Sequence, residues 1–155
     1  MKLSKNLSLK EVTKSITALR HGIDNTPDDQ VINNLELIAK EIFQPTRDHF
    51  GVPIAVTSGY RSKELNRKIG GSTYSQHMAG EALDLDADVF GEITNADIFK
   101  FIYTHLEYDQ LIWEFGDDEE PAWIHVSYKR KKGENRNRTL KAVKEDGKTT
   151  YILMQ

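Results

Sequence analysis

The chain has 155 residues, 38% of them hydrophobic, with 21 basic and 24 acidic side chains and no cysteine. This length suits one hydrophobic core and is short for two, so we expect a single domain over residues 1–155. The near balance of charge gives no general attraction to nucleic acid or an anionic membrane, and the lack of cysteine excludes disulfides and thiolate metal sites.

The first predicted element is a helix. Ser8 and Glu11 form a capping-box pattern, in which each side chain bonds the other residue's backbone N–H. The helix should continue to about Leu19, with Val12 and Ile16 on the same buried side as Leu19.

The spacing of apolar residues predicts a longer amphipathic helix over residues 28–49. Pro45 falls inside this pattern and should kink or break the helix, because proline lacks the N–H that the helix needs. A first strand is predicted over 52–57 and a short helix over 62–69.

Strand patterns dominate the second half, with one further helix over 95–105. The predicted strands cover residues 82–87, 108–115, 123–129, 139–143 and 149–153, the last two as a hairpin. Because helices come first and strands cluster later, we expect the α+β class, with a central antiparallel sheet and helices packed mainly from the N-terminal half.

Two segments contain the residue types of a metal site. Residues 75–84 read Ser-Gln-His-Met-Ala-Gly-Glu-Ala-Leu-Asp, and residues 123–127 read Trp-Ile-His-Val-Ser. Two histidines and one carboxylate form a ligand set that holds a catalytic zinc ion and leaves a fourth position open. We predict one zinc ion bound by His77, Asp84 and His125.

Other residues are alternatives for this role. Asp86 and Asp88 lie on the same strand face as Asp84, because side chains alternate along a strand. Either could therefore be the carboxylate ligand in place of Asp84. His21, His49 and His105 fall near predicted helix ends, where a histidine is favourable without any metal.

The pattern Ser-x-His-x-x-Gly-x-Ala-x-Asp, followed by Trp-Ile-His-Val-Ser, resembles peptidase family M15, the zinc D-Ala-D-Ala carboxypeptidases. That family includes carboxypeptidases that cleave peptidoglycan, vancomycin-resistance dipeptidases and phage endolysins. The similarity runs from about residue 7 to 128 in the order of the small single-domain branch, through segments 22–27, 44–47, 57–62 and 109–115. It implies a hedgehog/DD-peptidase-like fold and a zinc peptidase that hydrolyses peptidoglycan stem peptides with zinc-activated water, as a D-Ala-D-Ala carboxypeptidase or an endolysin-type endopeptidase.

The resemblance also implies substrate-binding residues. Arg61 matches the arginine of the family's Tyr-Arg pair and is expected to bind the developing oxyanion or a substrate carboxylate, with Tyr60 beside it. Ser75 matches a serine that helps to bind substrate. The alternatives are a surface arginine and a loop hydroxyl that bonds its own backbone.

The general base is where the chain departs from much of the family. Several members have an acid three residues before the last histidine, and here that position is Ala122. Glu114 is the leading replacement, because strand alternation and the similar Tyr-Glu strand of hedgehog domains place it on the face of His125. Glu119 and Glu120 are nearer in sequence, but a run of acids in a turn is usually solvated.

Two other functions compete with catalysis. A weak or inactive zinc-containing binding module of the same fold is favoured by Ala122 and opposed by Glu114. Nucleic-acid binding through the basic segments 129–132 and 136–138 is less consistent with the sequence, because no aromatic residues alternate with these charges beyond Tyr128. We therefore expect a peptidoglycan peptide as partner, no nucleic acid, no membrane insertion and a monomer.

The first residues contain no signal-peptide core, and no apolar run reaches the ~20 residues of a membrane span. An enzyme acting on the cell wall would then need another route to it. We expect a phage or prophage protein, made in the cytoplasm and acting on the wall after release or as part of a virion.

Overall fold

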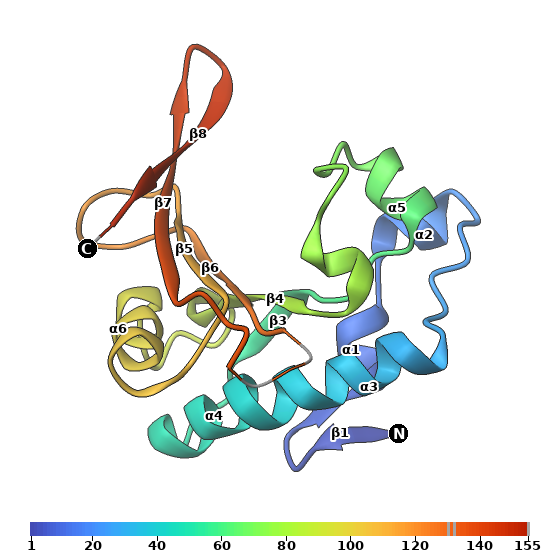
Figure 1. Cartoon of the computed structure of the whole chain (residues 1–155), viewed down its shortest axis with the longest axis horizontal. Coiled ribbons are helices and arrows are strands. Elements are labelled where there is room, and N and C mark those ends of the chain that lie inside the picture. Colours follow the sequence, from blue (N-terminus) through green and yellow to red (C-terminus); the bar gives the residue numbers. More distant parts are fainter. Residues whose placement is uncertain (130, 132, 155) are drawn as a thin grey trace.

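The computed structural model describes residues 1–129, 131 and 133–154. Its centre is a six-stranded sheet with the order β3-β4-β6-β5-β7-β8 (Figure 1). The strands are β3 (Ala55–Ser58), β4 (Ala82–Asp86), β5 (Gln110–Glu114), β6 (Trp123–Ser127), β7 (Arg138–Glu145) and β8 (Lys148–Leu153), and a separate pair is formed by β1 (Lys2–Ser4) and β2 (Leu7–Ser8).

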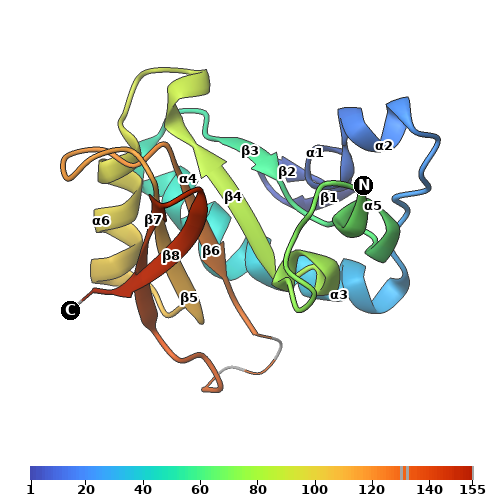
Figure 2. The same cartoon turned by 90° about the horizontal axis from the view of Figure 1, so that it is seen from above.

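The helices include two 3₁₀ turns and one π-helical turn. They are α1 (Leu9–Thr13), α2 (Ile16–Arg20), α3 (Asp29–Ile38), the π turn η1 (Ala39–Phe43), α4 (Gln44–Phe50), α5 (Lys63–Lys68), the 3₁₀ turns η2 (Gln76–Ala79) and η3 (Ala87–Val89), and α6 (Asn95–His105). Helices α1, α2 and α5 lie beyond the β3 edge, and the β7–β8 hairpin forms the opposite edge (Figure 2). No described helix has the length and apolar character needed to cross a bilayer.

The α+β class is confirmed, but the sheet is mixed rather than wholly antiparallel. Among the described strands, β5 and β7 pair in parallel, with Gln110 opposite Arg138. Strand β6 runs antiparallel to β5 and therefore ends where β5 begins. The following loop crosses β5 at that end, where Asn137 N–H donates to the Tyr108 carbonyl. Strand β7 then starts beside the start of β5 and runs in the same direction.

The predicted N-terminal helix is wrong in its second half. The capping box of Ser8 and Glu11 forms, but α1 ends at Thr13. The hydroxyl of Ser15 caps a new helix by accepting from Ala18 N–H, and this redirects the chain. As a result Ile16 is 73% and Leu19 is 85% exposed, where both were expected to be buried.

The chain does not break at Pro45; the irregularity there is a π turn. The chain stays helical from α3 to α4, but the turn η1 before Pro45 is π-helical, with Gln44 N–H donating to the Ala39 carbonyl. A π turn absorbs the hydrogen bond that proline interrupts.

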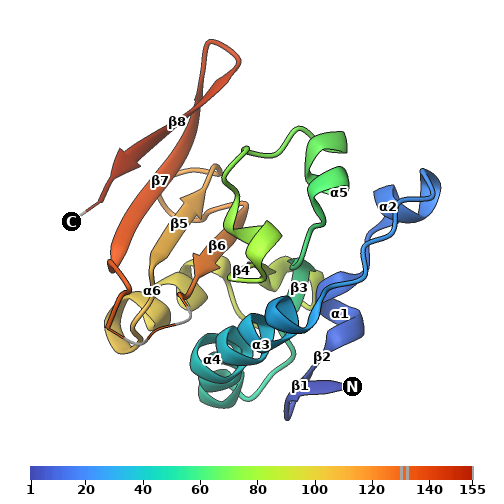
Figure 3. The ribbon, with the colours of Figure 1, turned by 45° about the vertical axis from the view of Figure 1, so that its right-hand side comes forward.

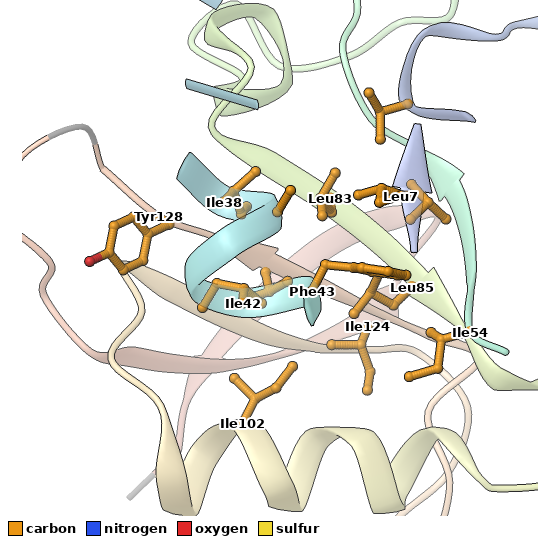
Figure 4. Packing of buried hydrophobic residues seen from close by; sticks show 14 of the residues in the cluster. Leu7, Ile38, Ile42, Phe43, Ile54, Leu83, Leu85, Ile102, Ile124 and Tyr128 are labelled. Atoms are coloured by element: carbon orange, nitrogen blue, oxygen red, sulfur yellow. The ribbon is translucent and has the colours of Figure 1, made fainter. Parts of the chain in front are cut away.

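One face of the sheet packs against helices, and the other is left for the site. Leu83 and Leu85 of β4 and Ile124 of β6 meet Ile42 of η1 and Ile102 of α6 in the main core (Figure 4). All five side chains are fully buried. Because neighbouring residues of a strand point to opposite faces, the residues between these apolar positions point away from the helices.

Candidate metal centre

Three side chains meet on the face of the sheet that the helices leave uncovered. One ligand atom from each of His77, Asp84 and His125 lies within 4.8 Å of the other two. Asp84 is central, since its Oδ1 is 3.3 Å from His77 Nε2 and 3.2 Å from His125 Nδ1. The three residues predicted as ligands are therefore brought together.

Strand register places two of these ligands. Asp84 of β4 lies directly opposite His125 of β6 in an antiparallel ladder. Side chains that are directly opposite share a face and lie close enough to contact the same ion. The buried residues on the reverse face, including Leu83 and Ile124, hold this register.

The third ligand comes from the 3₁₀ turn η2, just before β4. Ser75 caps this turn, its Oγ accepting from His77 N–H at 3.2 Å. Gly80 then turns the chain into β4 with a left-handed φ of 72°. A Cβ there would lie 2.8 Å from the Val31 backbone oxygen, so both conformation and space favour glycine.

The protonation of His77 fits a cation. Its Nδ1 lies 2.6 Å from the Gly59 carbonyl oxygen, which can only accept, so Nδ1 carries the proton. Burial lowers the pKa of His77, although Asp84 opposes this. With the proton on Nδ1, Nε2 presents a lone pair to the Asp84 carboxylate, and this nitrogen is buried with no hydrogen bond to any described residue.

Asp84 adds the negative charge of the centre. Burial alone would raise the pKa of Asp84, but the flanking His77 and His125 outweigh it and hold that pKa well below the ordinary range. Two imidazole nitrogens and a carboxylate oxygen thus lie close together, and the His77 nitrogen among them has a lone pair available to bind a metal ion. This donor set suits a divalent ion such as zinc.

The alternative ligands serve other purposes. Asp86 Oδ1 accepts from Asp88 N–H and from Asn95 Nδ2, which ties the end of β4 to α6. His49 stacks on Phe101 with ring centroids 4.2 Å apart.

Glu114 lies on the same sheet face as His125, as strand alternation predicts. It is opposite Trp123 on β6, two residues from His125. Glu114 is only 8% exposed, and this burial raises its pKa to about 7, with His125 opposing the rise and Asp84 adding to it. Such a pKa suits a group that accepts and returns a proton near neutral pH.

The competing acids of the 116–121 turn are placed differently. Glu120 Oε2 accepts from Ala96 N–H at 3.0 Å, at the start of α6. Glu119 is exposed, and its backbone N–H donates to Asp117. Among the described residues that line the cleft around the metal centre, Glu114 is present and these two are not.

A cleft of about 830 Å³ opens over the metal centre. The hairpin β7–β8 stands on one side of this sheet face and α5 with η2 on the other (Figure 3). Arg61 and Ser75 line the cleft, as expected for substrate-binding residues. The hydroxyl of Ser75 also caps η2 by accepting from a backbone N–H. The alternative role predicted for Ser75, a loop hydroxyl that bonds the local backbone, is therefore observed as well.

Arg61 is anchored at two points. Its backbone N–H donates to the His77 carbonyl at 3.1 Å, and its Nη1 donates to Asn66 Oδ1 at 3.3 Å. Its Nε is buried with no partner in the described part of the chain. Burial lowers the pKa of Arg61, with Asp84 opposing, but an arginine stays charged at neutral pH.

Tyr60, a predicted substrate-binding residue, is not among the described residues that line the metal cleft. Its N–H donates to the Val12 carbonyl at 2.7 Å, and its carbonyl accepts from Asn25. Tyr60 instead lines a neighbouring groove together with Leu65 and Ile69.

Sequence reasoning missed an ion pair between a buried aspartate and an arginine that lines the cleft. Asp109 is fully buried and is bonded by Arg136 through Nε at 3.0 Å and Nη2 at 2.8 Å. Gln76 Nε2 also donates to Asp109, at 2.9 Å. The sequence did contain one indication of this pair, since Asp109 is a charged residue directly before an apolar strand. Of the basic run 129–132, residues 130 and 132 lie outside the described residues, while Lys129 lines the cleft.

The comparison with protein families agrees with this geometry. The family model described as Peptidase M15 matches residues 5–127, and the chain belongs to the peptidase M15 family. The resemblance noted in the sequence is thereby confirmed, and the protein is a peptidase, a hydrolase. No curated protein matches the chain.

Proposed function

We propose that this protein is a zinc peptidase that hydrolyses amide bonds in peptidoglycan stem peptides. One observation carries the proposal: His77, Asp84 and His125 converge in a cleft that also contains Glu114. Family membership supports the peptidase chemistry, and the nitrogen and oxygen ligands support zinc.

When bound by these three residues, zinc would supply a Lewis acid that activates water and polarises a carbonyl. The Glu114 carboxylate accepts the proton that the attacking water loses and donates it to the nitrogen of the departing amine. Its pKa of about 7 balances these two tasks.

Arg61 supplies positive charge in the same cleft. Asn66 holds Nη1 of the guanidinium, and the part of the fork that faces the cleft would bind the oxyanion of the transition state or a substrate carboxylate. Because the Arg61 backbone N–H donates to the His77 carbonyl, the position of Arg61 relative to the proposed metal ligand His77 is fixed.

A second candidate is a zinc-containing module that binds wall peptides without cleaving them. Ala122 favours it, because several family members have an acid at this position. The burial of Glu114 on the face of the candidate metal ligands opposes it, since a buried carboxylate with a raised pKa costs stability and is typical of active sites.

The test is hydrolysis of purified muropeptides by zinc-loaded protein, with products sized by mass spectrometry. We expect cleavage at an amide bond, and product masses distinguish removal of a terminal D-Ala from cleavage of an internal bond. His125→Ala should abolish the products. Zinc-loaded protein that binds the peptides and leaves them intact would establish the binding module instead.

A further inference from the structure

The cleft has a second wall formed by chain that follows the family match. The match ends at residue 127, and the described residues of the wall are Lys129, Arg136 and residues of the β7–β8 hairpin. Figure 3 shows this hairpin standing opposite α5 and η2. Its cleft-lining side chains include Lys129, Arg136, Arg138 and Tyr151.

Arg136 is held in place by the buried Asp109. The guanidinium donates to both carboxylate oxygens through Nε and Nη2. An arginine has five N–H donors in a planar fork, so the others remain available on the cleft side. The Arg136 side chain is 45% exposed, while that of Asp109 is fully buried.

Arg138 lies on the metal-bearing side of the sheet. Leu140 of β7 and His125 of β6 both pair with Ile112 of β5, and Arg138 is two residues before Leu140 on the same face. With strands about 4.8 Å apart and residues about 3.4 Å apart along a strand, the Cα atoms of Arg138 and His125 are roughly 12 Å apart. Arg138 is exposed, and its side chain has no ion pair or hydrogen bond with any described residue.

The charges at this end of the cleft are unbalanced. Lys129, Arg136 and Arg138 face one buried carboxylate, Asp109, whose Oδ1 is 3.9 Å from Lys129 Nζ. Glu81 also lines the cleft, just before β4 and beside Tyr128, whose N–H donates to the Glu81 carbonyl, and β6 and β5 separate it from Arg138 on β7. The β7 end is therefore positive, and positive clefts concentrate anionic ligands.

We propose that Lys129, Arg136 and Arg138 form a subsite that binds a carboxylate of the substrate peptide. This inference rests on the proposed peptidase function and specifies its substrate as an acidic peptide. An extended peptide spans about 3.4 Å per residue, and an arginine side chain covers part of the distance to the metal centre. The recognised carboxylate therefore lies within about two residues of the scissile bond.

Two pairs of synthetic stem peptides test the subsite, each pair differing by one carboxylate replaced by a carboxamide. In one pair the change is at the α-carboxylate of the γ-linked glutamate, and in the other at the C-terminus. For at least one pair, wild-type kcat/KM should favour the carboxylate by about tenfold or more, as expected for a charged hydrogen bond. Arg138→Gln should bring this ratio close to one.

Lys148→Gln is the matched control, because it removes the same charge from an exposed position of the same hairpin outside the described cleft lining. It should keep the wild-type ratio. A wild-type ratio near one in both pairs, or an unchanged ratio in Arg138→Gln, would overturn the subsite.

A binding measurement separates this inference from the peptidase proposal. Isothermal titration calorimetry of the four peptides with zinc-loaded Glu114→Gln protein needs no hydrolysis. Tighter binding of the carboxylate form, lost on adding Arg138→Gln, supports the subsite even where wild-type protein cleaves nothing. Equal binding of both forms alongside active hydrolysis rejects the subsite and leaves the peptidase function intact.

Discussion

Asp84 Oδ1 and His125 Nδ1 are 3.2 Å apart because their residues lie opposite each other in the β4–β6 ladder. Buried residues on the reverse face of both strands hold this ladder in register. Two of the three proposed ligands are thus positioned by the core of the protein. Such preorganisation reduces the conformational entropy that metal binding would otherwise cost.

Replacing either histidine of the centre should remove the metal. His77→Ala or His125→Ala leaves two protein ligands, fewer than the three found in catalytic zinc sites. We expect elemental analysis to find about one zinc per wild-type chain and a large loss in both variants. His49→Ala and His105→Ala remove histidines near helix ends and should retain the metal. Zinc retained in both site variants would refute the ligand assignment.

Glu114→Gln should abolish most activity while preserving the metal. The amide has the shape of the carboxylate but is unable to accept a proton, so turnover should fall by roughly 10²–10⁴-fold. Stem-peptide hydrolysis and zinc content, measured on the same preparations, test this. Glu119→Gln and Glu120→Gln are the controls, and a loss confined to one of them would transfer the role of base to the acidic turn.

The same substitution should change how stability depends on pH. Folding raises the pKa of Glu114 from its ordinary 4.5 to about 7, so the folded protein holds this proton more tightly than the unfolded chain. The contribution of Glu114 to the free energy of unfolding of the metal-free protein should therefore fall as pH rises from 4.5 to 7. Glu114→Gln lacks this loss and should gain up to about 3 kcal/mol relative to wild type across that window. Urea denaturation at pH 5 and pH 8 measures the change, and an equal difference at both pH values would contradict it.

Arg61→Lys should slow catalysis without loss of zinc. Lysine keeps the charge but loses the planar fork that bonds Asn66 and an oxyanion together. We expect about a 10²-fold decrease in kcat, similar to removal of one oxyanion donor. Arg67→Lys makes the same exchange at an exposed position of α5 and should be silent. Near-normal turnover in Arg61→Lys would exclude Arg61 from the reaction.

Local patterns predicted those parts of the site that lie within regular strands. The two-residue period of a strand is enough to place Asp84, His125 and Glu114 on one face, because the apolar residues between them require the core. The cap of α6 was equally local: Thr94 and Asp97 bond each other's backbone, and the helix begins at the predicted residue.

Features that depend on distant segments were not predictable in this way. The parallel direction of β7 follows from a loop that crosses β5, and strand pattern carries no information about direction. The backbone of Tyr60 is held by bonds to Val12 and Asn25, which are far away in sequence. The Asp109–Arg136 pair likewise spans 27 positions, beyond the range of any local motif.

The placement of His77 on a 3₁₀ turn, outside the sheet, has a consequence for motion. Asp84 and His125 are fixed by a ladder, whereas η2 is attached from outside the sheet by separate hydrogen bonds, among them His77 Nδ1 to the Gly59 carbonyl at 2.6 Å. An ion bound to all three residues would fasten this turn to the sheet. Removing zinc should therefore speed amide hydrogen exchange in the turn through local opening, while exchange in β4 and β6 stays slow.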